Sequence, residues 1–100
     1  LDTVAPVASW KTDPFTPVVT DRSIIGLGAN DAKGCITAML CALHRVSRTD
    51  LPGEVVLALT VDEEIEEVNE GLEVLVGDLG RLDAAVIGEP TDLAICRAQK

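Results

Sequence analysis

Aromatic and basic residues are scarce in this sequence of 100 residues. Trp10 and Phe15 are the only aromatic residues and tyrosine is absent, so a core must be built from Ala, Val, Leu and Ile. Such a core favours helices packed on a buried sheet over a sandwich or barrel. Eight Lys and Arg residues against 17 Asp and Glu give a net charge of −9. This balance argues against a nucleic-acid partner, because clustered basic side chains provide most of the affinity for phosphate backbones.

Long apolar runs and paired cysteine motifs are also missing. No run approaches the roughly 20 apolar residues of a membrane span, and no basic segment followed by an apolar one marks a signal peptide. We therefore expect no membrane partner. Cys35, Cys41 and Cys96 are odd in number and lack CxxC spacing, which predicts reduced core residues in a cytoplasmic protein. The chain starts at Leu1 inside an apolar stretch, as a segment of a longer protein would.

Apolar runs alternate with helical patterns along the chain. Residues 5–23 contain three of the five prolines and predict a loop. Helical spacing predicts a mostly buried helix, capped by Asn30 or Asp31 and ending near Ser47, and a shorter one over 69–76 stopped by Gly77. Strands are predicted over residues 23–27, 55–61, 82–87 and 93–98. The run 55–61 is typical of a central parallel strand. This order predicts an α/β fold with a doubly wound, mostly parallel sheet and helices on both faces.

Acidic residues follow three of these predicted strands. Asp31 follows the strand 23–27, at the start of the first helix, Glu64 follows the strand ending at Val61, and Glu89 follows the strand ending at Ile87. Ligands of parallel sheets bind where the carboxyl ends of the strands meet. Carboxylates gathered there without a base repel one another unless a cation lies between them, so we predict a metal site.

The residue types alone leave the metal open. Sites made only of oxygen ligands favour magnesium, calcium or manganese, whereas zinc usually takes at least one His. The single His44 is about 20 Å along the helix from Asp31, at 1.5 Å per residue, and is expected to be a structural or surface residue. The other glutamates after Glu64 are expected to form a solvated helix face.

Several motifs, in order, resemble one family of dinuclear zinc hydrolases. The family contains acetylornithine deacetylase, succinyl-diaminopimelate desuccinylase, aminoacylase and related carboxypeptidases. The matching pieces extend over essentially all 100 residues. They are Leu1-Asp2-Thr3-Val4, Trp10-Lys11-Thr12-Asp13-Pro14-Phe15, Gly26 to Gly34, Thr60-Val61-Asp62-Glu63-Glu64 and Gly88-Glu89-Pro90-Thr91.

The resemblance implies a role for each matched acidic residue. Asp31 would bridge two zinc ions, for which Co²⁺ is a possible substitute, while Glu64 and Glu89 would each bind one ion. Glu63 would be the general base, and Asp2 would orient a metal-bound His, as carboxylates behind zinc ligands do. In the family pattern one His ligand immediately precedes Leu1 and another lies far downstream. The 100 residues would then be part of a catalytic domain, without the dimerisation domain, and inactive alone.

The resemblance also implies an activity and leaves alternatives. Acetylornithine deacetylase is the member most resembled, because of the loop from Trp10 to Phe15 and the Gly-Glu-Pro-Thr motif, which would place the protein in arginine biosynthesis. The expected substrate is a small N-acyl amino acid, and the full-length protein is expected to be a cytoplasmic homodimer. A related desuccinylase or carboxypeptidase, a non-catalytic metal-binding or interaction fragment, and an acidic domain without metal remain open. Ala32 and Glu66-Glu67 depart from the family pattern.

Overall fold

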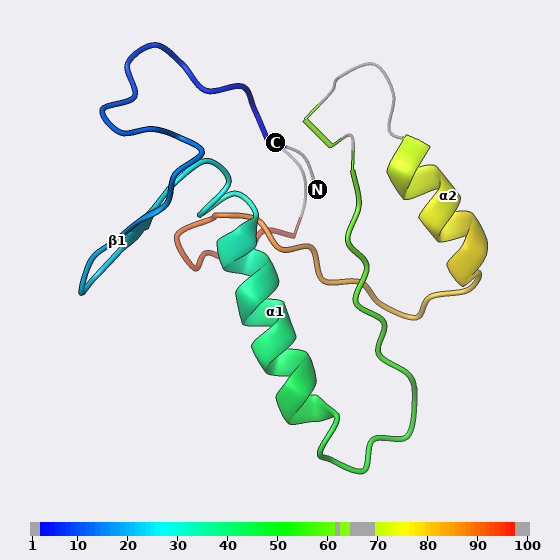
Figure 1. Cartoon of the computed structure of the whole chain (residues 1–100). Coiled ribbons are helices and arrows are strands. Elements are labelled where there is room, and N and C mark those ends of the chain that lie inside the picture. Colours follow the sequence, from blue (N-terminus) through cyan, green and yellow to red (C-terminus); the bar gives the residue numbers. More distant parts are fainter. Residues whose placement is uncertain (1–2, 62, 65–69, 98–100) are drawn as a thin grey trace.

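The computed structural model of the chain describes residues 3–61, 63–64 and 70–97. Its regular elements, in chain order, are β1 (Val18–Val19), β2 (Ile24–Ile25), α1 (Lys33–Val46) and α2 (Glu70–Leu79). Figure 1 shows α1 near the centre, with the β-hairpin and α2 on opposite sides of it. Helices and strands both occur, as the predicted α/β class requires.

The two strands form a short antiparallel hairpin. Val18 pairs with Ile25, and the next pair follows in register. The turn is closed by Thr20, whose N–H donates to the Ser23 carbonyl (2.9 Å) and whose hydroxyl accepts from the N–H groups of Arg22 (3.3 Å) and Ser23 (3.0 Å). Hydroxyls that accept such local backbone bonds stabilise turns. The strand predicted over 23–27 is thus present but shorter, and β1 lies where only a loop was expected.

Helix α1 lies close to its predicted position, but its first turn differs. Neither Asn30 nor Asp31 caps it: the N-cap residue is Ala32, and no side chain makes the capping bond. The loop backbone replaces the cap, because the Lys33 N–H donates to the Gly28 carbonyl (3.1 Å). Ser47 forms the C-cap, and His44 and Arg45 lie in the last turn. The positive charge of Arg45 interacts favourably there with the negative end of the helix dipole.

Helix α2 is longer than predicted, because it continues through Gly77. Its end is at Gly80, which has φ +68° and whose N–H donates to the Val76 carbonyl (3.2 Å). A positive φ is easily adopted only by glycine, so Gly80 is the residue able to terminate the helix. Neither α1 nor α2 is long and apolar enough to cross a membrane.

The segments 55–61, 82–87 and 93–97 form no ladder with any described residue, which differs from the predicted strands. Parallel strands need neighbours that satisfy their backbone groups on both sides, and no such neighbour lies beside these segments in the part that the structure describes. The only sheet there is the antiparallel hairpin. The doubly wound parallel sheet therefore stays a prediction.

Apolar side chains remain accessible throughout the described residues. None of these residues is buried, and Leu40 of α1, in the helix predicted to be mostly buried, is 50% exposed. The Cα radius of gyration is 16.0 Å, above the roughly 13 Å expected for a compact chain of this length. The cysteines are free, as predicted, but Cys41 and Cys96 are exposed rather than in a core. Apolar residues are core residues only when other elements cover them.

The two glycines of α2 provide a matched pair of substitutions. Gly77→Ala is expected to raise the protection of α2 amides from hydrogen exchange, because alanine favours a helix interior by about 1 kcal/mol and no atom lies within 4 Å of the added Cβ. Gly80→Ala has equally open surroundings but a positive φ, so it is expected to lower that protection. Equal effects of the two substitutions would contradict this account of the helix end.

Candidate functional site

The loop between β2 and α1 holds Asp31 and closes on its own backbone. The Ala29 N–H donates to the Gly26 carbonyl (3.1 Å), and the peptide bond from Asp31 to Ala32 is cis. Gly28 has φ +71°, and a Cβ there would lie 2.7 Å from Cγ2 of Thr3. Both its conformation and its neighbour therefore require glycine at this position. Asp31 is left exposed at the end of the loop.

Lys33 is a residue that the sequence-based prediction of the site missed. It is the first residue of α1, and its Nζ donates to the Leu27 carbonyl (3.2 Å) across the loop. The signal in the sequence was a single basic residue inside the glycine-rich motif around Asp31. Its hydrogen bond to Leu27 forms only because the loop folds back, and residue spacing alone does not show this fold.

The segment around Asp13 is attached to the same loop. The Asp13 carboxylate accepts from the Phe15 N–H (3.0 Å) and from the Thr16 hydroxyl (2.7 Å). These two bonds, the backbone bond first, hold the pKa of Asp13 below its ordinary value. The Leu27 N–H donates to the Pro14 carbonyl (2.8 Å). The motif around residues 10–15 is thereby joined to the motif around residues 26–34.

Close approaches at two glycines bring separate segments of the chain together. A Cβ on Gly88 would lie 2.6 Å from Cε of Met39 and 3.1 Å from Cβ of Cys35. The chain therefore passes closely over the first half of α1 at residue 88, which brings Glu89 near that end of the helix. A Cβ on Gly71 would lie 2.7 Å from the Val61 carbonyl oxygen, so the start of α2 lies against the segment that leads to Glu63.

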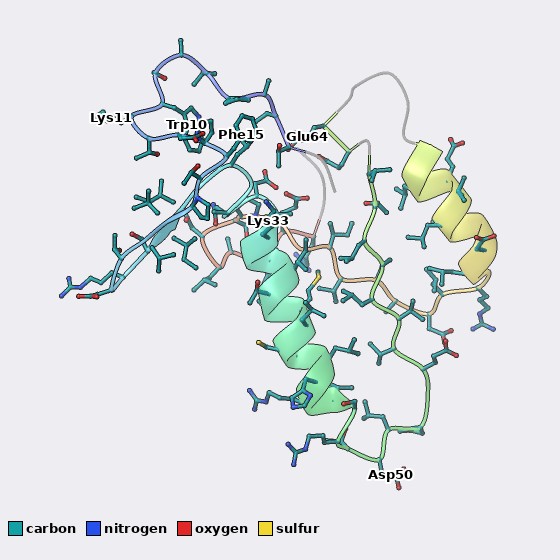
Figure 2. The ribbon with its side chains drawn as sticks, viewed as in Figure 1. Trp10, Lys11, Phe15, Lys33, Asp50 and Glu64 are labelled. Carbon is teal, nitrogen blue, oxygen red and sulfur yellow. The ribbon has the colours of Figure 1, made fainter. Side chains whose placement is uncertain are left out.

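Three of the predicted site residues act electrostatically on a fourth, Glu89. Partial burial raises the pKa of Glu89, and the negative charges of Asp31, Glu63 and Glu64 raise it further. Three separate chain segments therefore place their carboxyl groups in one region. Figure 2 shows Glu64 toward the end of α1 where Lys33 lies. The predicted metal site itself stays a prediction.

The carboxyl groups match a cation in charge but do not form a complete coordination shell. Within residues 3–61, 63–64 and 70–97, no three His, Cys, Asp or Glu side chains converge closely enough to hold a metal ion. His44 is exposed near the opposite end of α1, so it adds no ligand. Asp2 lies outside the described residues. The roles assigned to individual ligands thus stay predictions.

Comparisons with known proteins agree on one family. The model described as Peptidase family M20/M25/M40 matches residues 1–98. The succinyl-diaminopimelate desuccinylases of Methylobacillus flagellatus and Nitrosomonas eutropha are each 37% identical over 91 residues, covering 86% of this chain and 24% of the relative. That of Stenotrophomonas maltophilia is 35% identical over 94 residues, covering 89% of this chain and 25% of its own. The chain spans about a quarter of the length of these curated relatives. No solved structure matches it.

The electrostatic arrangement predicts a titration that NMR can follow. In the metal-free protein, the Glu89 carboxyl carbon is expected to titrate above the ordinary value of 4.5, and Asp31→Asn should lower that pKa by removing a negative neighbour. A raised carboxyl pKa favours the folded state below the unfolded-state pKa, and that stabilisation is lost as the pH rises through the raised pKa.

Asp50→Asn is the matched control for this titration. Asp50 lies beyond the C-terminal end of α1, away from Lys33 and Glu64 (Figure 2), so its charge should leave the Glu89 pKa unchanged. A Glu89 pKa that is insensitive to Asp31→Asn, or that moves equally with Asp50→Asn, would show that these carboxyl groups do not share one region.

Proposed function

Because this chain belongs to the peptidase family M20/M25/M40, we propose that it forms part of a catalytic domain that hydrolyses the amide bond of an N-acylated amino acid. Family membership and desuccinylase relatives support metal-dependent amide hydrolysis in general. The observation that supports the site is the raised pKa of Glu89, caused after partial burial by Asp31, Glu63 and Glu64. Like charges gathered in one region favour binding of a multivalent cation.

We assign the metal-binding roles to the carboxylates of this region. Asp31 would bridge two ions, with Glu64 and Glu89 each binding one of them, and Asp2 would orient a His ligand. Zinc, or cobalt in its place, would supply a Lewis acid that polarises the amide carbonyl and lowers the pKa of water. His ligands, which zinc usually requires, are expected from other parts of the full-length protein.

Glu63 is proposed as the general base. Its carboxylate would take a proton from the attacking water as the water oxygen bonds to the carbonyl carbon. It would then return that proton to the nitrogen as the C–N bond breaks, which gives a carboxylic acid and an amine. Transfer of the acid's proton to the amine then leaves a carboxylate and an ammonium group. Glu63 can do this only while it is not a metal ligand. Glu63 and Glu64 follow each other in a turn, and we propose that they divide the two tasks.

The acyl group is the part of the substrate on which the observations differ. The motifs of the chain resemble acetylornithine deacetylase, whereas the reported relatives are named succinyl-diaminopimelate desuccinylases. We therefore propose an acylated amino acid as the substrate and place succinyl beside acetyl as a candidate. The homodimeric state of the full-length protein stays a prediction.

The division of roles between the adjacent glutamates is tested in the full-length protein with two isosteric substitutions. Glu63→Gln should lower kcat by roughly 10²-fold to 10⁴-fold, the usual contribution of a general base, with metal content retained. Glu64→Gln should instead weaken metal binding by more than the roughly 10-fold to 100-fold typical of a lost supporting contact. Metal analysis together with steady-state kinetics measures both. Near-normal turnover of the Glu63 variant would refute its role as the base.

The activity itself is tested by amine release from N-succinyl-diaminopimelate and from N-acetylornithine. The full-length protein should hydrolyse at least one of them, lose this activity with a chelator, and regain it with Zn²⁺ or Co²⁺. The 100-residue chain is the control and should release no amine, because it provides the carboxylates without the expected His ligands. Metal binding without amine release from any N-acyl amino acid would favour the non-catalytic alternative.

A further inference from the structure

Lys33 connects the start of α1 to the beginning of the loop that holds Asp31. Its side chain folds back so that Nζ donates to the Leu27 carbonyl at 3.2 Å. The ammonium group also lies over Gly28, where an added Cβ would be 3.5 Å from Nζ. Lys33, which follows the loop, therefore bonds back to Leu27 at its beginning.

Three hydrogen bonds close this loop, and Lys33 makes two of them. Its N–H donates to the Gly28 carbonyl (3.1 Å), its Nζ donates to Leu27, and the third bond joins the Ala29 N–H to the Gly26 carbonyl (3.1 Å). Asp31 lies in the chain between Leu27 and Gly28, which accept the two Lys33 bonds, and their donor Lys33. Fixing Lys33 against residues 27 and 28 thus fixes both ends of the segment on which Asp31 lies.

Leu27 is held through both of its backbone groups. Its N–H donates to the Pro14 carbonyl (2.8 Å), and its carbonyl accepts from Lys33. Loss of the Lys33 side chain would remove the hydrogen bond to the Leu27 carbonyl. Water would then be the donor to this carbonyl. Hydrogen bonds from a charged donor are roughly twice as strong as those between neutral groups, so a neutral substitute should hold the loop less well.

The charge of Lys33 also suits its surroundings. Figure 2 shows Lys33 at the end of α1 toward which Glu64 lies, and the charges of Asp31, Glu63 and Glu64 act on Glu89 in the same region. A cation bound to a backbone carbonyl offsets part of this repulsion at long range.

We propose that Lys33 is a positioning residue: its ammonium group, bonded to the Leu27 carbonyl, holds the loop of residues 27–33 and so fixes the position of Asp31, which is assigned above as a metal ligand. The metal-binding part of this inference rests on the proposed function, whereas its effect on the loop does not. Lys33 touches neither substrate nor metal in this role and acts only through the backbone around Asp31.

The test compares Lys33→Met, Lys33→Gln and Lys33→Arg in the full-length protein. Methionine keeps the apolar stem without a donor, glutamine provides a neutral donor, and arginine restores a charged donor. Lys11→Met is the control, because Lys11 is exposed and makes no hydrogen bond or ion pair with another described residue. Hydrogen exchange of the Ala29 and Lys33 amides in the metal-free protein measures the loop, and calorimetric titration with Zn²⁺ measures metal affinity.

We expect Lys33→Met to speed exchange of these two amides and to weaken zinc binding by roughly 10-fold to 100-fold, as loss of a supporting partner does. Lys33→Arg should keep the exchange rates and the zinc affinity close to those of the unsubstituted protein, and Lys33→Gln should give values between those of the arginine and methionine variants. Lys11→Met should resemble the unsubstituted protein. At saturating zinc, the loss of activity in Lys33→Met should be largely recovered, which a simple loss of folded protein would not allow.

Two outcomes would overturn the inference. One is unchanged exchange and zinc affinity in Lys33→Met, and the other is an arginine variant no better than the methionine variant. If the methionine variant does not fold, the order of the glutamine and arginine variants decides, and equal values for these two would refute the role of the charged donor. An unsubstituted protein that binds no zinc and cleaves no N-acyl amino acid would refute the proposed function instead, while the exchange measurement would still test Lys33.

Discussion

Repulsion among carboxyl groups near the start of α1 is the constraint on which the candidate site depends. Two unit charges 4 Å apart interact by about 1 kcal/mol in water and about 4 kcal/mol in the partly screened surroundings of a protein surface. Partial burial raises the pKa of Glu89, and the negative charges of the neighbouring carboxyl groups raise it further. A chain that gathers Asp31, Glu63, Glu64 and Glu89 must hold them by other contacts or bind a cation between them. The chemistry proposed for the site uses the same charge that makes the site unfavourable without a cation.

Short backbone contacts, rather than burial of apolar surface, position the site within the described residues. None of those residues is buried, so hydrophobic burial, usually the dominant stabilising contribution, is small here. The position of Asp31 depends instead on the loop closed at Gly28 and Lys33, and that of Glu89 on the close passage of Gly88 over Met39. Pro14 and Leu27 join two motifs that are separated in the sequence.

Helices were easier to predict from the sequence than strands, for a physical reason. The 3.6-residue periodicity of α1 and α2 lies within one segment, so their existence could be predicted from the residues alone. Their ends were less certain, because Ala32 rather than Asn30 or Asp31 is the N-cap, and Gly80 rather than Gly77 ends α2. A strand forms only against a partner, and apolar composition at residues 55–61 and 82–87 does not supply one. The hairpin β1–β2 was missed in part because its turn depends on the Thr20 hydroxyl rather than on glycine.

The sequence by itself determined the chemistry: the carboxylates Asp31, Glu63, Glu64 and Glu89, the motifs that contain them and the family to which the chain belongs. Residue types and their order along the chain are sufficient for this, because the chemical groups and the motif spacing are properties of the sequence. Only the tertiary structure decided which of these groups influence one another, and that Lys33 reaches the Leu27 carbonyl. Electrostatic interactions and hydrogen bonds depend on distances through space, and the folded path of the backbone sets those distances.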